Sequence, residues 1–214
     1  MEVRHAPGEG AAAEQVRGVL PAALREARQW GAVPAAITLT IHATHGELEA
    51  ATGRTGNPWM RAWARPGAVD LQSPATWTRG HASDAALTQI LAHELTHCVL
   101  FQAAGRDGSR DVPLWFQEGM ASVAARERHS VAHPDAIQHP ASVIRAEPRL
   151  FYGTADRAFR ALVHRFGESR VRALLARLGE GRGFAAAFRD AMGVGVAEFE
   201  GDLARDLAAL AVHP

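Results

Sequence analysis

The chain has 214 residues, and its 23 Lys and Arg side chains balance 23 Asp and Glu side chains, so the formal net charge is zero. A balanced charge gives no general attraction to nucleic acid or to an anionic membrane, and we expect neither as a partner. The length suits one substantial core or two lobes, and a hydrophobic fraction of 47% is ordinary for a globular protein.

No apolar run reaches the length of a membrane span, and the first residues do not read as a signal peptide. Cys98 is the single cysteine, so an internal disulfide is excluded. Taken literally, the sequence predicts a cytoplasmic protein.

Helical and strand patterns alternate through the first hundred residues. Apolar side chains at spacings of three and four predict a helix over residues 11–30, kinked or restarted at Pro21. Alternating apolar and β-branched residues predict strands, with Pro and Gly breaks between them. The next expected elements are a strand at 36–42, a short polar helix at 45–53, strands at 59–64 and 68–72, and a polar loop at 76–83.

An apolar helix follows, and it contains His-Glu-Leu-Thr-His at residues 93–97. Side chains four positions apart lie on one face of a helix, so His93 and His97 can direct imidazole nitrogens at one cation, with Glu94 beside them. Two solvated histidines on a surface helix are the ordinary alternative, but the flanking residues are too apolar for that. The motif predicts one zinc ion per chain, with Glu94 as the general base for a bound water.

Catalytic zinc usually has a third protein ligand, and the apolar stretch 112–121 contains one carboxylate, Glu118. A partly exposed helical glutamate is the ordinary interpretation of such a residue. Ligation by Glu118 is the functional one.

The two segments together resemble the gluzincin metallopeptidases of the peptidase MA-like group. Their pattern is HExxH followed by W-x-x-E-G-x-A, and the second part is present here as Trp-Phe-Gln-Glu-Gly-Met-Ala at residues 115–121. The resemblance implies that Glu118 completes a His, His, Glu ligand set. It also implies hydrolysis of a peptide bond in a peptide or protein substrate.

Two other zinc peptidase patterns fit less well. A metzincin has a third His six positions after the second, and that position is Ala103. An aspzincin uses an Asp ligand, but Asp107 and Asp111 lie in a stretch broken by Gly and Pro, where we expect a loop.

The resemblance also points to further residues. Relatives often use a Tyr or His to stabilise the oxyanion, and Tyr152 is the only tyrosine, although a boundary tyrosine with its hydroxyl in water is an equal alternative. Ser122 departs from the family, because relatives tend to carry an acidic residue four positions after the Glu ligand. A carboxylate that orients a His ligand is then missing or comes from elsewhere. The other candidates for the oxyanion are His129, His133 and His139.

We expect an α+β fold, with a small mixed sheet packed on the HExxH helix and then a mostly helical C-terminal lobe, a minimal thermolysin or gluzincin-like arrangement. Residues 1–104 and 105–214 would form the two lobes of one catalytic unit. In the second lobe, a Pro-broken loop precedes four helices. These helices are expected at 157–166, 168–178, 184–192 and 196–211.

Three functions fit these observations. The first is a zinc-dependent peptidase. The others are an inactive scaffold that binds a partner peptide, and a metal-dependent hydrolase of a non-peptide amide. For the peptidase we expect residues 68–72 to be the edge strand beside the cleft, pairing antiparallel with the substrate, and Asp70 could cap a free N-terminus there.

Overall fold

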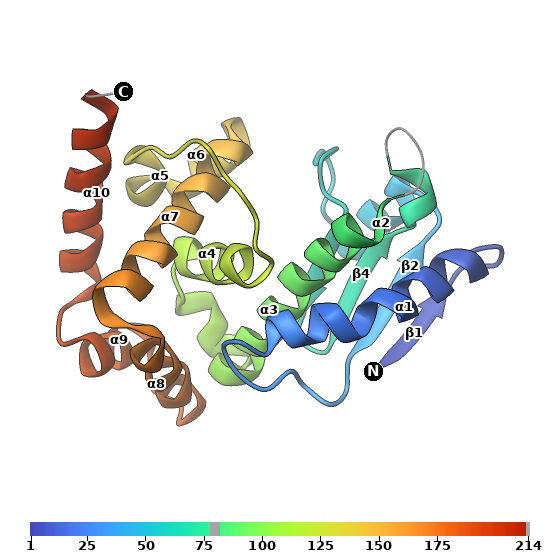
Figure 1. The fold of residues 1–214 in the computed structure, drawn as a ribbon, viewed down its shortest axis with the longest axis horizontal. Coiled ribbons are helices and arrows are strands. Elements are labelled where there is room, and N and C mark those ends of the chain that lie inside the picture. The colour runs from blue at the N-terminus through green and yellow to red at the C-terminus, as the bar shows by residue number, and fades with distance from the viewer. Residues whose placement is uncertain (78–81, 213–214) are drawn as a thin grey trace. The chain divides into compact units, whose positions relative to one another are not determined.

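The computed structural model describes residues 1–77 and 82–212, and the chain separates into two compact units, Met1–Phe101 and Gln102–Pro214 (Figure 1). The fold is of the α+β class, with one small mixed sheet and many helices among the described residues. Within those ranges, no helix is both long enough and apolar enough to span a membrane.

The first unit contains the sheet. Its strands lie in the order β1-β2-β4-β3, in which β1, β2 and β4 run parallel and β3 runs antiparallel to β4. The elements in chain order are β1 (Glu2–His5), α1 (Gly10–Ala27), β2 (Thr38–His42), α2 (His45–Thr52), β3 (Ala62–Arg65), β4 (Ala68–Gln72) and the start of α3 (Asp84–Gly108).

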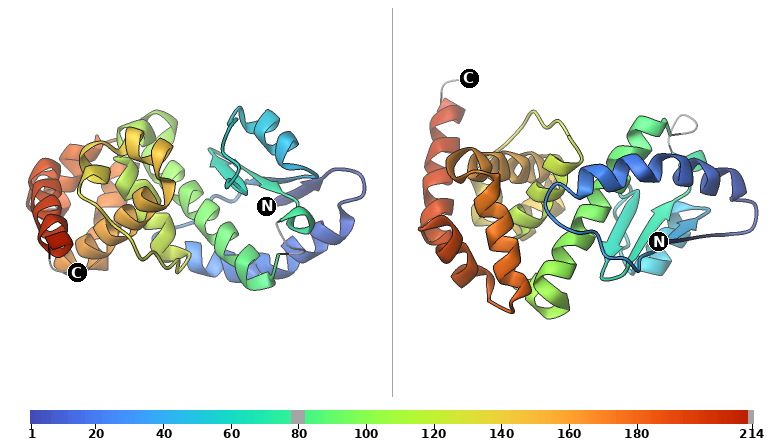
Figure 2. Two further views of the ribbon diagram at one scale, coloured as in Figure 1. Left: turned by 90° about the horizontal axis from the view of Figure 1, so that it is seen from above. Right: turned by 60° about the horizontal axis from the view of Figure 1, so that its bottom comes forward.

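The two faces of the sheet differ in polarity. Leu39 and Ile41 of β2 pair with Val69 and Leu71 of β4, and all four side chains are fully buried on one face. His45 of α2 contacts a side chain of β4 on the other face, so the apolar face belongs to the opposite side, where α1 and α3 lie (Figure 2). The helix α3 is therefore held by apolar contact with the sheet.

Residues 68–72 form an interior strand, so the prediction that they form the edge was wrong. β4 is paired on one side with β2 and on the other with β3, and the edges of the sheet are β1 and β3. The prediction relied on the closeness in sequence of residues 68–72 to α3, and this closeness does not determine the order of the strands. A strand with buried residues on both faces gains most from pairing on both sides, because an edge leaves N–H and C=O groups unpaired.

Asp70 is not available to cap a substrate N-terminus either. Its side chain is 2% exposed, and its two carboxylate oxygens contact His42 Nε2 and Arg65 Nε, each at 2.9 Å. This carboxylate therefore pairs with neighbouring side chains on the polar face of the sheet.

Other boundaries in this unit shift by a few residues, whereas the helix expected at 157–166 begins nine residues earlier, at Pro148. The helix α1 is one helix that contains Pro21, rather than two segments with a restart there, and β3 begins three residues after the expected strand start. α2 has the expected extent, because Thr44 caps its first turn and Gly53 ends it in the left-handed conformation. The predicted loop at 76–83 includes residues 78–81, which lie outside the described residues.

The second unit is helical. We expected a Pro-broken loop before Tyr152, but two short helices lie there, because Pro134 and Pro140 suit helix starts. Its elements are α4 (Leu114–Ala124), α5 (Asp135–Gln138), α6 (Pro140–Ala146), α7 (Pro148–Phe166), α8 (Glu168–Gly179), α9 (Phe184–Met192) and α10 (Val196–Val212).

Close contact between α4 and α7 forms the centre of this unit. The Phe116 ring meets the rings of Phe159 and Phe184 edge to face, at centroid distances of 5.2 and 5.1 Å. A Cβ atom at Gly119 would lie 2.2 Å from the carbonyl oxygen of Ala155, so only glycine permits this approach. The contacts of Phe116 and Gly119 together fix the rotation of α4 about its axis.

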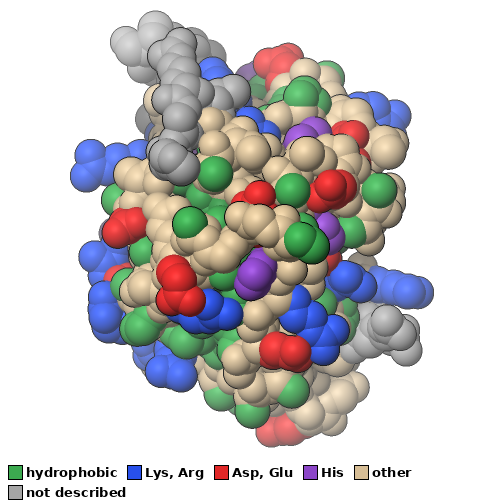
Figure 3. Space-filling view, turned by 90° about the vertical axis from the view of Figure 1, so that its right-hand side faces the viewer, with side chains coloured by type: hydrophobic (Ala, Val, Ile, Leu, Met, Phe, Trp, Pro, Cys, Tyr) green, Lys and Arg blue, Asp and Glu red, His purple; other side chains and the backbone are tan. Residues whose placement is uncertain are grey.

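Charged side chains of both signs are mixed on one face of the molecule (Figure 3). On the face drawn in Figure 3, acidic and basic side chains are interspersed, and hydrophobic side chains are scattered among them rather than gathered into one patch. This distribution agrees with the zero net charge and gives that face no strong field of one sign.

We predict that Gly119→Ala lowers the free energy of unfolding by about 2–3 kcal/mol, because the new methyl group overlaps the α7 backbone. The matched control is Gly18→Ala in α1, where a Cβ meets nothing within 4 Å and alanine should add up to about 1 kcal/mol through helix propensity. Urea unfolding followed by far-UV circular dichroism measures both. Equal stability of the two variants would show that α4 and α7 are not in close contact.

Candidate metal centre

The helix α3 begins with a side-chain cap and has one apolar stripe. The Ser83 hydroxyl accepts a hydrogen bond from the Ala86 N–H at 3.2 Å. Leu87, Leu91 and Leu95, four residues apart, are fully buried along one side. Because these leucines face the core, they fix the rotation of α3 about its own axis. That rotation determines the direction of the polar side chains of the 93–97 motif.

His93 and His97 lie one turn apart on α3, as their spacing predicts. Their ring centroids are 4.9 Å apart in an edge-to-face arrangement, and the ring of Phe101, one turn further on, stacks near His97 at 6.2 Å. His97 is 8% exposed and Glu94 is 9% exposed. These are polar groups in a largely apolar environment, where a hydrogen-bonding or ionic partner is needed.

The predicted ligands form a group that could hold a metal ion. Possible ligand atoms of His93, His97 and Glu118 all lie within 4.8 Å of one another. Among the described side chains this is the one such group of three or more His, Cys, Asp or Glu residues, and Asp111 is not part of it. The side chain of Asp107 lies outside the described residues.

Glu118 is half-buried on α4, and the turn before that helix is held in place by hydrogen bonds. Gln117 Nε2 donates to the Val112 carbonyl at 2.8 Å, and Pro113 precedes the first helical residue. Trp115 Nε1 donates to the Glu200 carboxylate at 2.7 Å, which ties α4 to α10. Together with the close approach at Gly119, these contacts fix the direction of the Glu118 side chain within its unit.

A carboxylate that the sequence did not reveal is hydrogen-bonded to the face of α4 that carries Glu118. Ser122 is one turn after Glu118 and fully buried, and its hydroxyl donates to Glu127 Oε2 at 2.9 Å. The same oxygen contacts His129 Nε2 at 3.0 Å. Ser122 is thus hydrogen-bonded to a carboxylate that comes from outside the helix. Glu127 lies beyond the end of the helix, so no helical spacing could have pointed to it.

Tyr152 is half-buried on α7, and its ring meets Phe151 edge to face at 5.6 Å. Its part in stabilising an oxyanion stays a prediction. Of the alternatives, His129 is engaged by Glu127, His133 Nδ1 lies 3.5 Å from a carboxylate oxygen of Asp135, and His139 is exposed.

The donor set suits zinc. Two neutral imidazoles and one carboxylate are an accepted ligand set for catalytic zinc, which keeps a fourth position for water. Cys98 adjoins His97 in sequence, but successive residues point about 100° apart around a helix, so its sulfur faces another direction. Burial, with a smaller contribution from the charge of Glu94, raises the pKa of the Cys98 thiol to about 12.

We predict that Cys98 reacts slowly with iodoacetamide at pH 8 in the native protein, because the thiol is 1% exposed and its raised pKa leaves little thiolate. The rate should be at least about 100-fold below that of the chain unfolded in guanidinium chloride. Mass spectrometry of timed samples measures it, with and without chelator. A chelator that exposes the thiol in the folded protein would argue that Cys98 binds the metal.

Comparisons of the chain with models of known protein families, with curated proteins and with solved structures found no match. A functional assignment therefore depends on the geometry of these residues.

Proposed function

We propose that this chain is a zinc-dependent peptidase of the gluzincin type. The observation that carries the proposal is the grouping of His93, His97 and Glu118, with Glu94 on the same helix as the two histidines. A structural zinc site is normally closed by four protein ligands, whereas three leave a position for water. The buried glutamate between them is the group that hydrolysis needs.

The residues of the chain then have separate tasks. His93, His97 and Glu118 would hold zinc, which supplies polarisation of the substrate carbonyl and an acidified water. Glu94 accepts the proton of the attacking water and returns it to the leaving nitrogen. Tyr152 is our candidate for donating a hydrogen bond to the oxyanion.

The fold supports this assignment. A small mixed sheet packs on α3, and a helical unit follows in which α4 contains Trp115, Glu118, Gly119 and Ala121 in the gluzincin order. The requirement for Gly119 is physical, since it allows α4 to approach α7. We propose that the chain has a minimal gluzincin-like fold.

The decisive variant is Glu94→Gln, because the amide keeps the shape of the side chain but is not a base. We expect it to retain one zinc per chain and to lose at least about 100-fold in the rate of peptide hydrolysis. A mixture-based library of peptides, digested and read by mass spectrometry, supplies substrates, and atomic emission measures the zinc. Glu180→Gln, the same change at the exposed residue that follows α8, is the matched control and should have wild-type activity.

Three outcomes would contradict the proposal. Loss of zinc in Glu94→Gln would mean that Glu94 is a ligand. Activity near the wild-type rate would remove Glu94 from the mechanism. A wild-type protein that holds one zinc and cleaves no peptide would favour a binding scaffold or a hydrolase of other amides.

A further inference from the structure

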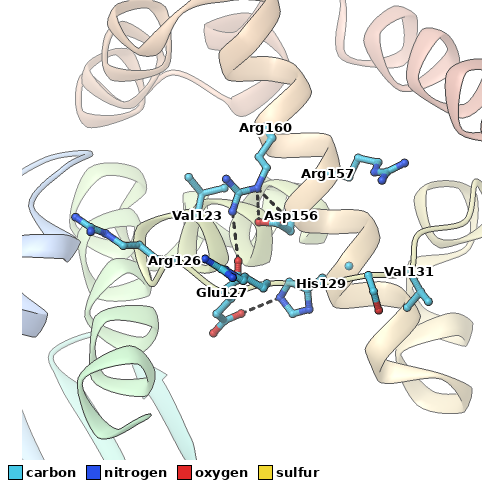
Figure 4. Close-up of a pocket in the computed structure, with 11 residues that line it drawn as sticks. Val123, Arg126, Glu127, His129, Val131, Asp156, Arg157 and Arg160 are labelled. Carbon is cyan, nitrogen blue, oxygen red and sulfur yellow. Dashed lines mark hydrogen bonds and ion pairs between the residues drawn. The ribbon is translucent and has the colours of Figure 1, made fainter. Parts of the chain in front are cut away.

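A pocket of about 600 Å³ lies in the second unit, between the segment that follows α4 and one side of α7 (Figure 4). Arginine dominates its ionisable lining. Four arginines face two carboxylates there, and these residues are Arg126, Arg128, Arg157, Arg160, Glu127 and Asp156. A cavity with this excess of guanidinium groups is suited to an anionic ligand.

The two carboxylates of the pocket already have partners within the unit. Both oxygens of Asp156 accept from Arg160 Nε, at 3.0 and 2.9 Å. Glu127 accepts from Ser122 and contacts His129. Asp156 is thus engaged by Arg160, and one oxygen of Glu127 is engaged by Ser122 and His129.

Two arginines remain without partners. The side chains of Arg128 and Arg157 are exposed, and they make no hydrogen bond or ion pair with any residue in the described ranges. A guanidinium group presents donors in a planar fork that matches a carboxylate in bidentate fashion. Each is thus free to receive a carboxylate from a ligand.

The positive charge is spread along the pocket. Arg126 extends toward one end and Arg157 toward the other, with Arg160 between them (Figure 4). An extended chain with more than one carboxylate matches this arrangement, and Val131, which is 48% exposed, offers it an apolar contact.

The wall of the pocket is held in place. The carbonyl oxygen of Val131 approaches α7 so closely that a Cβ at Gly153 would lie 1.9 Å from it, and the His133 N–H donates to Thr154 Oγ1 at 3.0 Å. Arg126 has a φ of 54°, a conformation that non-glycine residues rarely adopt and that costs about 1 kcal/mol or more. The surrounding contacts maintain this conformation, so the binding surface is pre-organised.

We infer that this pocket binds the acidic side chains of a peptide, and, resting on the proposed function, that it selects substrates with Asp or Glu near the scissile bond. The pocket begins at Val123, five residues after Glu118 on α4, which corresponds to a rise of about 7.5 Å. An extended peptide spans that distance in about two to three residues. The acidic residues of the substrate should lie at about that separation from the cleaved bond.

Binding is tested without turnover, by fluorescence anisotropy with the full chain carrying Glu94→Gln. The probes are labelled octapeptides with blocked termini, one with three Asp or Glu residues and one with Gln and Asn in their place. We expect the acidic peptide to bind at least about tenfold more tightly and to weaken as NaCl is raised. A third peptide, neutral but with a free C-terminal carboxylate, should bind no better than the blocked neutral one.

Substitutions locate the binding to the pocket. Arg128→Gln with Arg157→Gln should weaken the acidic peptide by about tenfold, because two charge-assisted contacts are removed. Arg145→Gln on α6 is the control, since it removes the charge of an exposed arginine of the same unit that lies outside the pocket. Thermal unfolding of each variant shows that the fold is intact.

The inference is overturned if the acidic and neutral peptides bind equally, if the free C-terminus alone gives tight binding, or if the pocket variant behaves as the control does. These results are independent of hydrolysis. A protein that binds acidic peptides through these arginines and cleaves none keeps the pocket assignment and loses the proposed function. A peptidase indifferent to acidic residues keeps the function and loses the pocket assignment.

Discussion

Two imidazoles and a carboxylate lie in a helix whose other buried side chains are mostly apolar, and the rest of the candidate site depends on how those three polar groups are paired. Burying such groups costs several kcal/mol unless they are paired, and a single cation can pair with both imidazole nitrogens at once. The helical repeat places His93 and His97 one turn apart, with ring centroids at 4.9 Å. A cation with open coordination positions meets this requirement economically.

In the second unit, the close packing of α4 against α7 fixes the direction of the remaining candidate ligand, Glu118. Gly119 removes the one atom that would separate these helices, and Phe116 fills the space beside it. Glu118 lies between these two anchors in sequence, so its direction follows from core packing rather than from local flexibility. Ser122 then connects the same helix face, through Glu127, to the wall of the arginine pocket.

Local patterns predicted most helices and the alignment of His93 with His97, because helical spacing fixes which side chains share a face, whereas Glu118 was predicted through the resemblance of residues 115–121 to the gluzincin pattern. They failed where the answer depended on partners distant in sequence. β4 is an interior strand because β2 pairs with the side of β4 that β3 leaves open. β1 was missed because Val3 is its only apolar residue, and β1 forms through pairing with β2. Glu127 lies in a loop, and only the folded chain brings it to Ser122.

Zinc-edge X-ray absorption of the chain loaded with one equivalent of zinc tests the central claim most directly, because it identifies the ligand atoms. Ligation by His93, His97 and Glu118 predicts nitrogen and oxygen neighbours at about 2.0–2.2 Å, outer scattering from two imidazoles and no sulfur. The imidazole signal should fall by half in His97→Ala. A sulfur neighbour at about 2.3 Å, which could come only from Cys98 or a methionine, or a spectrum unchanged in His97→Ala, would contradict the account.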